Sequence, residues 1–221
     1  MLKIVLVMID DTLLTLVKFL KLWVGNQDLI LMTDLTKRLN GMKAIGTELK
    51  DVYIIENKLF QDDRGFFMES FNSQQFCDII GYSLEFVQDN HSKSSQSVLR
   101  GLHYQVKRPQ GKLMRCISGA IYDVAVDLRR SSHTFGRWIG VTLNRPEKQL
   151  WIPPGFAHGF HVMSETAEVT YKTTDYYVPN DQETLAWDDP TLNIDWLTTR
   201  NPILSNKDMV GKSFDECHTY E

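Results

Sequence analysis

From residue 42 onward, the apolar positions fall into short stretches rich in aromatic and β-branched residues, which is typical of β-strands. Glycine, proline and asparagine separate these stretches. We expect strands over residues 52–55, 65–71, 97–104, 120–127, 138–143, 149–152, 159–162 and 168–177. Many short strands between turn signals predict an all-β sandwich or barrel rather than a βαβ fold. One helix is predicted near residues 73–80.

The N-terminal part, residues 1–41, has a different pattern. Its first apolar run stops at Asp10, well short of the roughly 20 residues that a membrane helix needs. Residues 12–24 are apolar at helical spacing, which leaves an amphipathic anchoring helix as an alternative, but the features of a signal peptide are missing. We expect residues 1–41 to be an extension, either a mis-start or a poorly packed segment, and residues 42–221 to form one domain.

Composition narrows the class of protein. The chain has 221 residues, which suits a single domain, and its 24 Lys and Arg against 28 Asp and Glu give a net charge of −4. A mildly acidic chain lacks the basic surface of a nucleic-acid binder. The cysteines Cys77, Cys116 and Cys217 are few and far apart, which excludes a disulfide scaffold and suits a reducing compartment. We therefore expect a cytoplasmic protein with neither nucleic acid nor membrane as a partner.

Histidines are the first candidates for chemistry. His103 lies in an apolar stretch two residues after Gly101, and His158 and His161 follow a Pro-Pro-Gly turn. A lone strand histidine is more often a hydrogen-bonded core residue than a base. In cupin-type barrels, two or three histidines and a glutamate bind a metal, but the sequence after His103 lacks the second imidazole of a His-x-His pair. We expect no metal, and a metal-dependent cupin remains an alternative.

Tyrosines form a second candidate group. In a regular strand, Tyr171, Thr173, Asp175 and Tyr177 share one face, because side chains alternate. If that face lines the interior, two phenols and a carboxylate point inward. Ordinary aromatic filling is the alternative. A buried tyrosine requires a polar partner, so an interior that also holds histidine and lysine favours a ligand site.

Arginines next to strand glycines form a third group. Arg64 precedes Gly65 and Arg100 precedes Gly101, and such fork-shaped donors suit a diphosphate. On a regular strand Arg100 and His103 would point to opposite faces. Both can face the interior only if the strand has a bulge, which Gly101 permits.

The motifs as a set resemble those of the dTDP-4-dehydrorhamnose 3,5-epimerase family. They are DDRGFFMES, FVQDNHSKS, VLRGLHYQ, GKLMR, DVAVDLR, FGRWIGV, QLWIPPGFAHGF, YKTTDYY and the WDDP and IDW ending, in this order from about Met42 to about Asp208. The resemblance implies an all-β cupin-type jelly-roll β-barrel with a few short helices, usually a homodimer, without metal or organic cofactor. It also leaves residues 1–41 without a family counterpart.

The resemblance further implies a reaction and its residues. The substrate is dTDP-4-dehydro-6-deoxyglucose, a nucleotide sugar that is epimerised at the two carbons flanking its ketone on the route to dTDP-rhamnose. His103 matches the family's base, Asp208 the carboxylate that orients it, Tyr171 the proton donor on the opposite face, and Lys112 the lysine near the developing oxyanion. Positions that match substrate contacts are Arg64, Glu69, Gln88, Asp89, Asn90, Arg100, Lys112, His158 and Lys207.

Two further positions concern nucleotide recognition. Tyr177 matches the aromatic residue that stacks on thymine. Gln182 stands where the family usually has glutamate, and Glu183 follows it. A glutamine keeps a hydrogen bond and loses the charge, which puts one substrate contact in doubt.

Other activities remain open at the level of sequence. A relative could invert only one carbon or isomerise the ketone. A non-catalytic cupin could merely bind a nucleotide sugar, although a binder needs no acid–base pair such as His103 and Tyr171.

Overall fold

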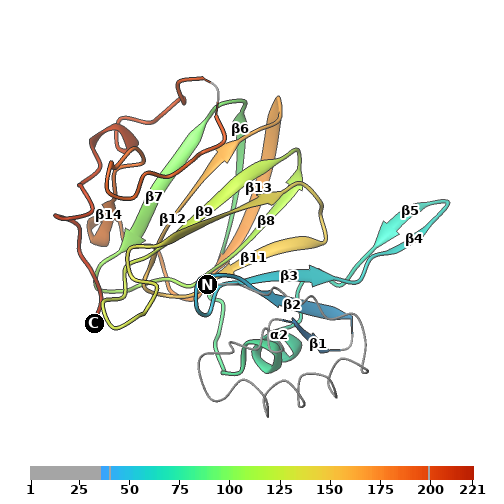
Figure 1. Ribbon diagram of the computed structural model, residues 1–221. Helices are drawn as coiled ribbons and strands as arrows, with labels where there is room; N and C mark the ends of the chain where they lie inside the picture. Colours follow the sequence, from blue (N-terminus) through green and yellow to red (C-terminus); the bar gives the residue numbers. More distant parts are fainter. Residues whose placement is uncertain (1–35, 40, 199) are drawn as a thin grey trace, which may run out of the picture.

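The computed structural model describes residues 36–39, 41–198 and 200–221, and the apolar stretch 12–24 lies outside them (Figure 1). Two antiparallel sheets face each other and confirm the all-β prediction. The seven-stranded sheet has the order β1 (Thr36–Leu39), β2 (Met42–Gly46), β3 (Tyr53–Asn57), β11 (Lys148–Ile152), β8 (Lys112–Ser118), β13 (Thr166–Thr173), β6 (Gln88–Ser95). The five-stranded sheet has the order β10 (Trp138–Leu143), β9 (Ile121–Asp127), β12 (Phe156–Val162), β7 (Leu99–Gln105), β14 (Gln182–Thr184).

The apolar core lies between the two sheets. Inward side chains of both sheets form it, among them Met114, Leu150, Phe160 and Val169. A second cluster lies on the other side of the five-stranded sheet, where the C-terminal segment covers it with Leu192 and other apolar residues. The five-stranded sheet is therefore buried on both faces, which is why β9 and β12 are buried along their whole length.

The predicted helix is confirmed as α2 (Ser73–Ile80). It begins because the side chain of Asn72 accepts a hydrogen bond from the Gln75 amide, and it ends at Gly81 in the left-handed conformation. Its apolar face packs on the outer side of the seven-stranded sheet, and Phe76 meets Trp151 edge-on at 5.2 Å between ring centroids. No helix in the described part of the chain is long and apolar enough to span a membrane.

The bulge expected at Gly101 is confirmed. Between β12 and β7, His158 lies opposite His103 and Phe160 opposite Arg100, so one residue of β12 faces two of β7. Gly101 has φ +126°, and a Cβ there would lie 2.5 Å from the Cα of Gly159, so the position requires glycine. The extra residue turns Arg100 to the same face as His103.

Strand β13 is shorter than predicted. It ends at Thr173, so Asp175 and Tyr177 lie in the loop that follows and do not continue the alternation of Tyr171 and Thr173. The side chain of Asp175 pairs at the surface with Arg108. The expectation that these four residues share one strand face is therefore wrong for the last two.

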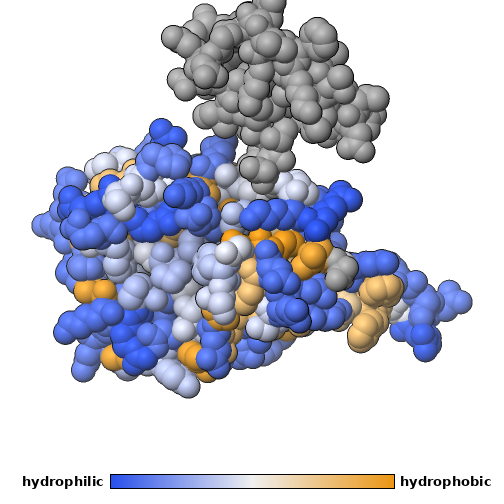
Figure 2. Space-filling view, turned by 90° about the horizontal axis from the view of Figure 1, so that it is seen from below, coloured by the Kyte–Doolittle hydropathy of each residue, from blue (hydrophilic) through white to orange (hydrophobic). Residues whose placement is uncertain are grey.

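The predicted strand over residues 65–71 is shorter than expected, because only residues 65–67 form a strand, the second of a hairpin. Strands β4 (Phe60–Asp62) and β5 (Gly65–Phe67) form a separate two-stranded sheet that projects from the body (Figure 1). Apolar side chains gather on this projection (Figure 2); Phe60, Phe66 and Phe67 are 52%, 56% and 71% exposed. Within the expected extension, β1 pairs with β2 at the edge of the large sheet.

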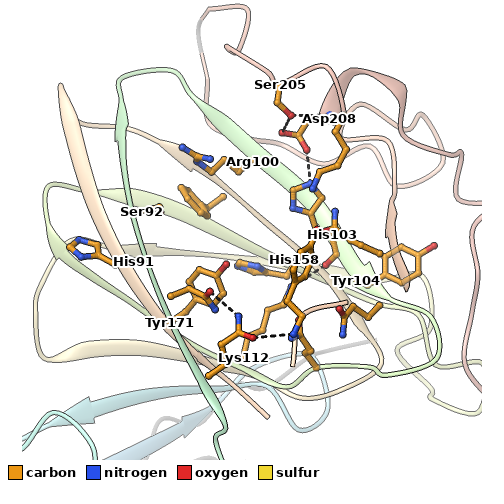
Figure 3. A pocket seen from close by; sticks show the side chains of 18 residues that line it. His91, Ser92, Arg100, His103, Tyr104, Lys112, His158, Tyr171, Ser205 and Asp208 are labelled. Atoms are coloured by element: carbon orange, nitrogen blue, oxygen red, sulfur yellow. Dashed lines mark hydrogen bonds and ion pairs between the residues drawn. The ribbon is translucent and has the colours of Figure 1, made fainter. Parts of the chain in front are cut away.

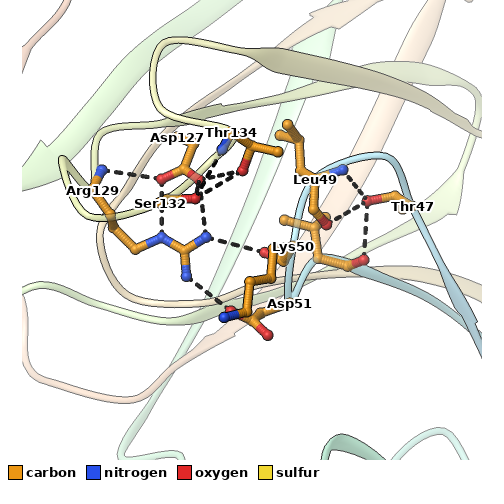
Figure 4. A network of polar contacts seen from close by, with 9 residues as sticks. Thr47, Leu49, Lys50, Asp51, Asp127, Arg129, Ser132 and Thr134 are labelled. Carbon is orange, nitrogen blue, oxygen red and sulfur yellow. Dashed lines mark hydrogen bonds and ion pairs between the residues drawn. The ribbon is translucent and has the colours of Figure 1, made fainter. Parts of the chain in front are cut away.

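A polar network ties the loop after β2 to the end of β9 (Figure 4). The carboxylate of Asp127 is fully buried and accepts hydrogen bonds from Arg129, Ser132 and Thr134. Arg129 also reaches Asp51 at 3.0 Å. These bonds hold the pKa of Asp127 below its ordinary value, although burial alone would raise it.

Candidate active site

A cavity of about 410 Å³ opens between the two sheets at one end of the sandwich (Figure 3). Side chains from β6, β8 and β13 form one wall, side chains from β7 and β12 form the other, and the C-terminal segment closes the rim with Ser205, Lys207 and Asp208. Most of the side chains that line the cavity are polar, so the cavity interrupts the apolar core between the sheets.

His103 and Asp208 form a hydrogen-bonded pair at the rim. The Nε2 atom of His103 lies 2.5 Å from Oδ1 of Asp208, and Ser205 donates its hydroxyl to Oδ2 of the same carboxylate at 2.7 Å. Burial lowers the pKa of His103, and Asp208 partly opposes this effect. Hydrogen bonds from His103 and Ser205 hold the pKa of Asp208 below its ordinary value despite burial. At neutral pH the pair is a neutral imidazole oriented by a carboxylate, which is the form of a general base.

Lys112 lies deep in the cavity. Its ammonium group donates a hydrogen bond to the main-chain oxygen of His103 at 3.1 Å. Burial lowers its pKa to about 8, with Asp123 opposing that shift and Lys207 adding to it. The group therefore carries most of its charge at neutral pH and can stabilise negative charge that develops on a ligand.

His158 and Asp123 form a second pair behind the first. The Nε2 atom of His158 lies 2.6 Å from Oδ1 of Asp123, and both residues are buried. Burial lowers the pKa of His158, against the effect of the carboxylate. Oδ2 of Asp123 has no hydrogen-bond partner within the described residues.

Tyr171 faces the histidines from the opposite sheet (Figure 3). It lies on β13 of the seven-stranded sheet, whereas His103 lies on β7 of the five-stranded sheet. Burial raises the pKa of Tyr171, so its phenol keeps its proton at neutral pH. A ligand between the sheets would have a base on one side and an acid on the other.

Most of the predicted site residues meet in this cavity. Those that line it are Gln88, Asn90, Arg100, His103, Lys112, His158, Tyr171, Tyr177, Gln182, Lys207 and Asp208. Among the described residues, Nε2 of Gln182 is buried without a hydrogen-bond partner. The bulge in β7 is what allows Arg100 and His103 to line the same cavity.

Three predicted residues lie elsewhere in the single chain. Arg64 lies at the tip of the projecting hairpin, where its side chain pairs with Asp62. Glu69 lines a separate hollow beside that hairpin. Asp89 points to the outer face of the seven-stranded sheet and pairs with Lys172 at 2.9 Å.

Asp123 and Ser205 are among the residues of the site that the sequence reasoning missed. Asp123 had a detectable signal, because it is a carboxylate at the third position of the otherwise apolar strand β9. Ser205 had no such signal, since serine is common in loops and nothing in the sequence distinguishes this one. Its contact with Asp208 appears only in the folded chain.

Metal binding was expected to be absent. His91, His103 and His158 contribute imidazoles to the cavity wall, and His161 is buried without lining it. In the described residues, no group of three or more His, Cys, Asp or Glu side chains is arranged to hold a metal ion. Each of these three cavity histidines has its Nε2 atom paired with a carboxylate: His91 with Glu168, His103 with Asp208 and His158 with Asp123.

Comparison with known sequences identifies relatives over most of the chain. A family profile described as dTDP-4-dehydrorhamnose 3,5-epimerase matches residues 46–216. The dTDP-4-dehydrorhamnose 3,5-epimerase of Shigella flexneri is 54% identical over 175 residues, covering 78% of this chain and 96% of that protein. The enzyme of the same name from Escherichia coli is 55% identical over 177 residues, covering 79% of this chain and 96% of its own length.

Solved structures show the same architecture. The epimerase from Elizabethkingia anophelis superposes with a TM-score of 0.77 at 45% identity, covering 80% of this chain and 98% of that one. A dTDP-6-deoxy-D-glucose-3,5-epimerase from Legionella pneumophila, in complex with dTDP-4-keto-L-rhamnose, gives a TM-score of 0.78 at 46% identity and covers 80% and 95%. The fold is the cupin-type jelly roll that the sequence resemblance implied.

Proposed function

This chain belongs to the dTDP-4-dehydrorhamnose 3,5-epimerase family, and on that premise we propose that it epimerises dTDP-4-dehydro-6-deoxyglucose at C3 and C5 to dTDP-4-dehydro-L-rhamnose. The protein is an isomerase that acts on a nucleotide sugar in dTDP-rhamnose biosynthesis. The protons on C3 and C5 are acidic because the C4 ketone can become an enolate. Inversion requires removal of a proton from one face of the ring and its return to the other.

The observation that carries the proposal is the placement of His103 and Tyr171 on opposite sheets across one cavity. His103, neutral and oriented by Asp208, removes the proton from the first face. Tyr171, protonated at neutral pH, returns a proton to the second face. A single group on one wall could exchange the proton, but it could not invert the carbon.

Lys112 supplies the electrostatic part of the reaction. As a proton leaves the ring carbon, negative charge develops on the C4 oxygen, and a buried ammonium group stabilises that charge more than water does. Its hydrogen bond to the main chain of His103 places it beside the base. His158, paired with Asp123, provides a further polar group in the same wall for the sugar hydroxyls.

The nucleotide occupies the outer part of the cavity in this proposal. Arg100 and Lys207 hold the diphosphate, Tyr177 stacks on thymine, and Gln88, Asn90 and Gln182 contact the sugar or the base. Tyr177 is 45% exposed at the cavity rim, which leaves a ring face free for stacking. No metal or organic cofactor takes part.

We further propose a cytoplasmic homodimer. Arg64 and Glu69 match substrate-binding positions of the family, yet they lie on or beside the projecting hairpin and outside the cavity of their own chain. A second copy that receives this hairpin brings them to its site and covers the exposed side chains of Phe66 and Phe67.

The decisive experiment is turnover of dTDP-4-dehydro-6-deoxyglucose in heavy water followed by NMR. An enzyme that inverts both centres incorporates deuterium at C3 and C5 and yields the L-rhamno product. Activity that persists after exhaustive chelation would support the metal-free mechanism. Absence of turnover with this substrate would refute the proposal.

A second candidate is inversion of a single carbon. A 3'-monoepimerase from Streptomyces bikiniensis, solved with dTDP-quinovose, has a TM-score of 0.72 at 28% identity with this chain. Deuterium at only one of the two carbons, with one inverted centre in the product, would favour that reaction.

A further inference from the structure

Tyr177 lies in an irregular segment, residues 174–178, between β13 and the short helix η2 (Pro179–Asp181). Its ring is 45% exposed, so packing alone holds it weakly. The direction of the ring therefore depends on how its main chain is held. Because this segment belongs to neither sheet, sheet hydrogen bonds do not fix its main chain. Hydrogen bonds from side chains hold the main chain in place instead.

The amide of Gln105 binds the main chain on both sides of Tyr177. Its Nε2 atom donates to the oxygen of Tyr176 at 3.1 Å and to the oxygen of Arg108 at 2.9 Å. Its Oε1 atom accepts from the amide of Val178 at 2.6 Å. Both halves of one side-chain amide are thus used, and all three partners are main-chain atoms.

Gln105 is itself rigidly held. It is 2% exposed, it is the last residue of β7, and its backbone pairs with Gln182 of β14. Its main-chain oxygen also accepts a hydrogen bond from the hydroxyl of Tyr220 at 2.5 Å. A side chain anchored in this way can impose a position on the segment that it binds.

Two more glutamines of the cavity wall bind the same segment. Oε1 of Gln88 accepts from the amide of Tyr177 at 3.0 Å, and Nε2 of Gln110 donates to the oxygen of Asp175 at 2.7 Å. Every peptide group from Asp175 to Val178 therefore contacts one of three glutamine side chains. The remaining amino group of Gln88 donates to Asn90 at 2.9 Å.

We infer that Gln105 is a positioning residue for nucleotide recognition: by binding the peptide groups before and after Tyr177, it fixes the ring in the orientation that stacks on the base. This role rests on the proposed function, in which Tyr177 stacks on thymine. Gln105 need not touch the nucleotide, since its amide is already satisfied by main-chain partners.

Gln105→Met tests the role because methionine has a similar shape and no hydrogen-bonding amide. The substitution leaves the oxygen of Tyr176 and the amide of Val178 without their partner, so the segment loosens while β7 keeps its packing. Calorimetry with two probes separates the effects: dTDP, and 2-deoxyribose 5-diphosphate, which lacks the base. We expect dTDP to bind about tenfold more weakly, the magnitude of one lost base–aromatic stack, with base-free binding unchanged.

A double variant tests whether Gln105 acts on dTDP binding through the ring of Tyr177. Tyr177→Ala alone should weaken dTDP by a similar factor, and adding Gln105→Met should weaken it no further, because the ring that Gln105 positions is already gone. In turnover, Gln105→Met should raise KM for the nucleotide sugar and change kcat by less than about twofold. Equal losses for both probes, or losses that add in the double variant, would overturn the positioning role.

Controls separate positioning from general damage. Gln149 is also buried, at 3% exposure, and its Nε2 donates to the main-chain oxygen of Ser70 at 2.9 Å, outside the cavity. Gln149→Met removes a similar amide and should leave dTDP binding unchanged. If Gln105→Met does not fold, Gln105→Glu keeps the acceptor for Val178, loses both donors, and must show the same base-dependent loss. A wild-type chain that binds dTDP and does not epimerise would refute the proposed function without touching this role.

Discussion

His103 contacts Asp208 at 2.5 Å between Nε2 and Oδ1, although the two residues are 105 positions apart in the chain. The histidine belongs to β7 of the five-stranded sheet, and the carboxylate begins the short helix η3 (Asp208–Val210) in the C-terminal segment. The C-terminal segment thus completes the candidate base, while Ser205 of that segment fixes the second carboxylate oxygen. Nδ1 of the imidazole is left to accept a proton.

The first prediction concerns Asp208→Asn. An amide can still accept the hydrogen bond of His103, but the negative charge that raises the pKa of His103 is lost. Since burial already lowers that pKa, it should fall further, and the acidic limb of kcat/KM, where the base becomes protonated, should move to lower pH. The weaker base should reduce kcat by ~10²-fold or more. Ser205→Ala keeps the charge and should leave the limb nearly in place; an upward shift in Asp208→Asn would contradict this assignment.

The second prediction concerns Lys112. Its pKa is lowered to about 8 by burial, so its charge should be present below pH 8 and lost above it. If that charge stabilises the enolate, kcat should fall on the alkaline side of pH 8. Asp123 raises the pKa of Lys112, so Asp123→Asn should lower it and move the alkaline limb to lower pH. A pH–rate profile of both proteins measures this, and an unmoved limb would show that Lys112 is not the titrating group.

The sequence predicted those strands in which aromatic and β-branched residues form a distinct apolar stretch. Strand β10 has the predicted bounds, β9 begins one residue later than predicted, and β12 begins three residues earlier. Strand β6 was missed because polar side chains point to both of its faces, toward the cavity and toward the surface. The periodicity of apolar residues therefore cannot predict a strand that is polar on both faces.

Part of the site was predictable from the alternation of side chains along a strand and from the position of one glycine. Strand parity and Gly101 predicted the bulge that turns Arg100 and His103 the same way, and the register of β7 and β12 confirms it. The contact of His103 with Asp208 could not follow from spacing, because it joins distant segments; only the family resemblance pointed to it. Arg64 lies outside the cavity of its own chain, and the proposed homodimer would bring it to the site of a second copy.

The third prediction concerns stability. Asp127 is fully buried and binds Arg129, whose side chain is 19% exposed, so Asp127→Ala leaves that guanidinium without its main partner. Loss of one member of such a pair should lower the free energy of unfolding by about 3–5 kcal/mol. Urea unfolding at pH 7 measures it. Glu168→Ala, which breaks surface pairs with Lys93 and His91, is the control and should change stability little.

The same pair predicts a pH dependence of stability. The folded-state pKa of Asp127 is depressed by its hydrogen bonds from Arg129, Thr134 and Ser132, which outweigh the effect of burial. Its contribution should be complete above the unfolded-state pKa, about 3.9, and should be lost as the pH falls through the folded-state pKa. Asp127→Ala should therefore lose less stability than the wild type on acidification. Parallel losses in the two proteins would contradict this linkage.

The fourth prediction tests the contribution of a second copy. Arg64→Ala and His103→Ala should each be inactive as homodimers, the first through lost substrate binding and the second through the lost base. If the hairpin of one copy completes the cavity of the other, a mixed dimer contains one intact site. Random mixing of equal amounts should then restore about one quarter of wild-type activity, since about half of the dimers are mixed and each has one site. No recovery after subunit exchange would place Arg64 in its own chain's site, and an active Arg64→Ala homodimer would place it outside the site altogether.

The last prediction separates the two proton-transfer roles. His103→Ala removes the group that takes the protons, so exchange of the C3 and C5 protons with heavy water should nearly stop. Tyr171→Phe keeps the ring and its packing on β13 but removes the hydroxyl that returns a proton from the other sheet. That variant should still wash solvent deuterium into the substrate through His103, while inversion falls by ~10²–10⁴-fold. NMR of the recovered sugar counts exchanged and inverted carbons in one sample. Near wild-type inversion in Tyr171→Phe, or free exchange in His103→Ala, would require a different acid or base among the cavity residues, with Tyr177 the next phenol to test.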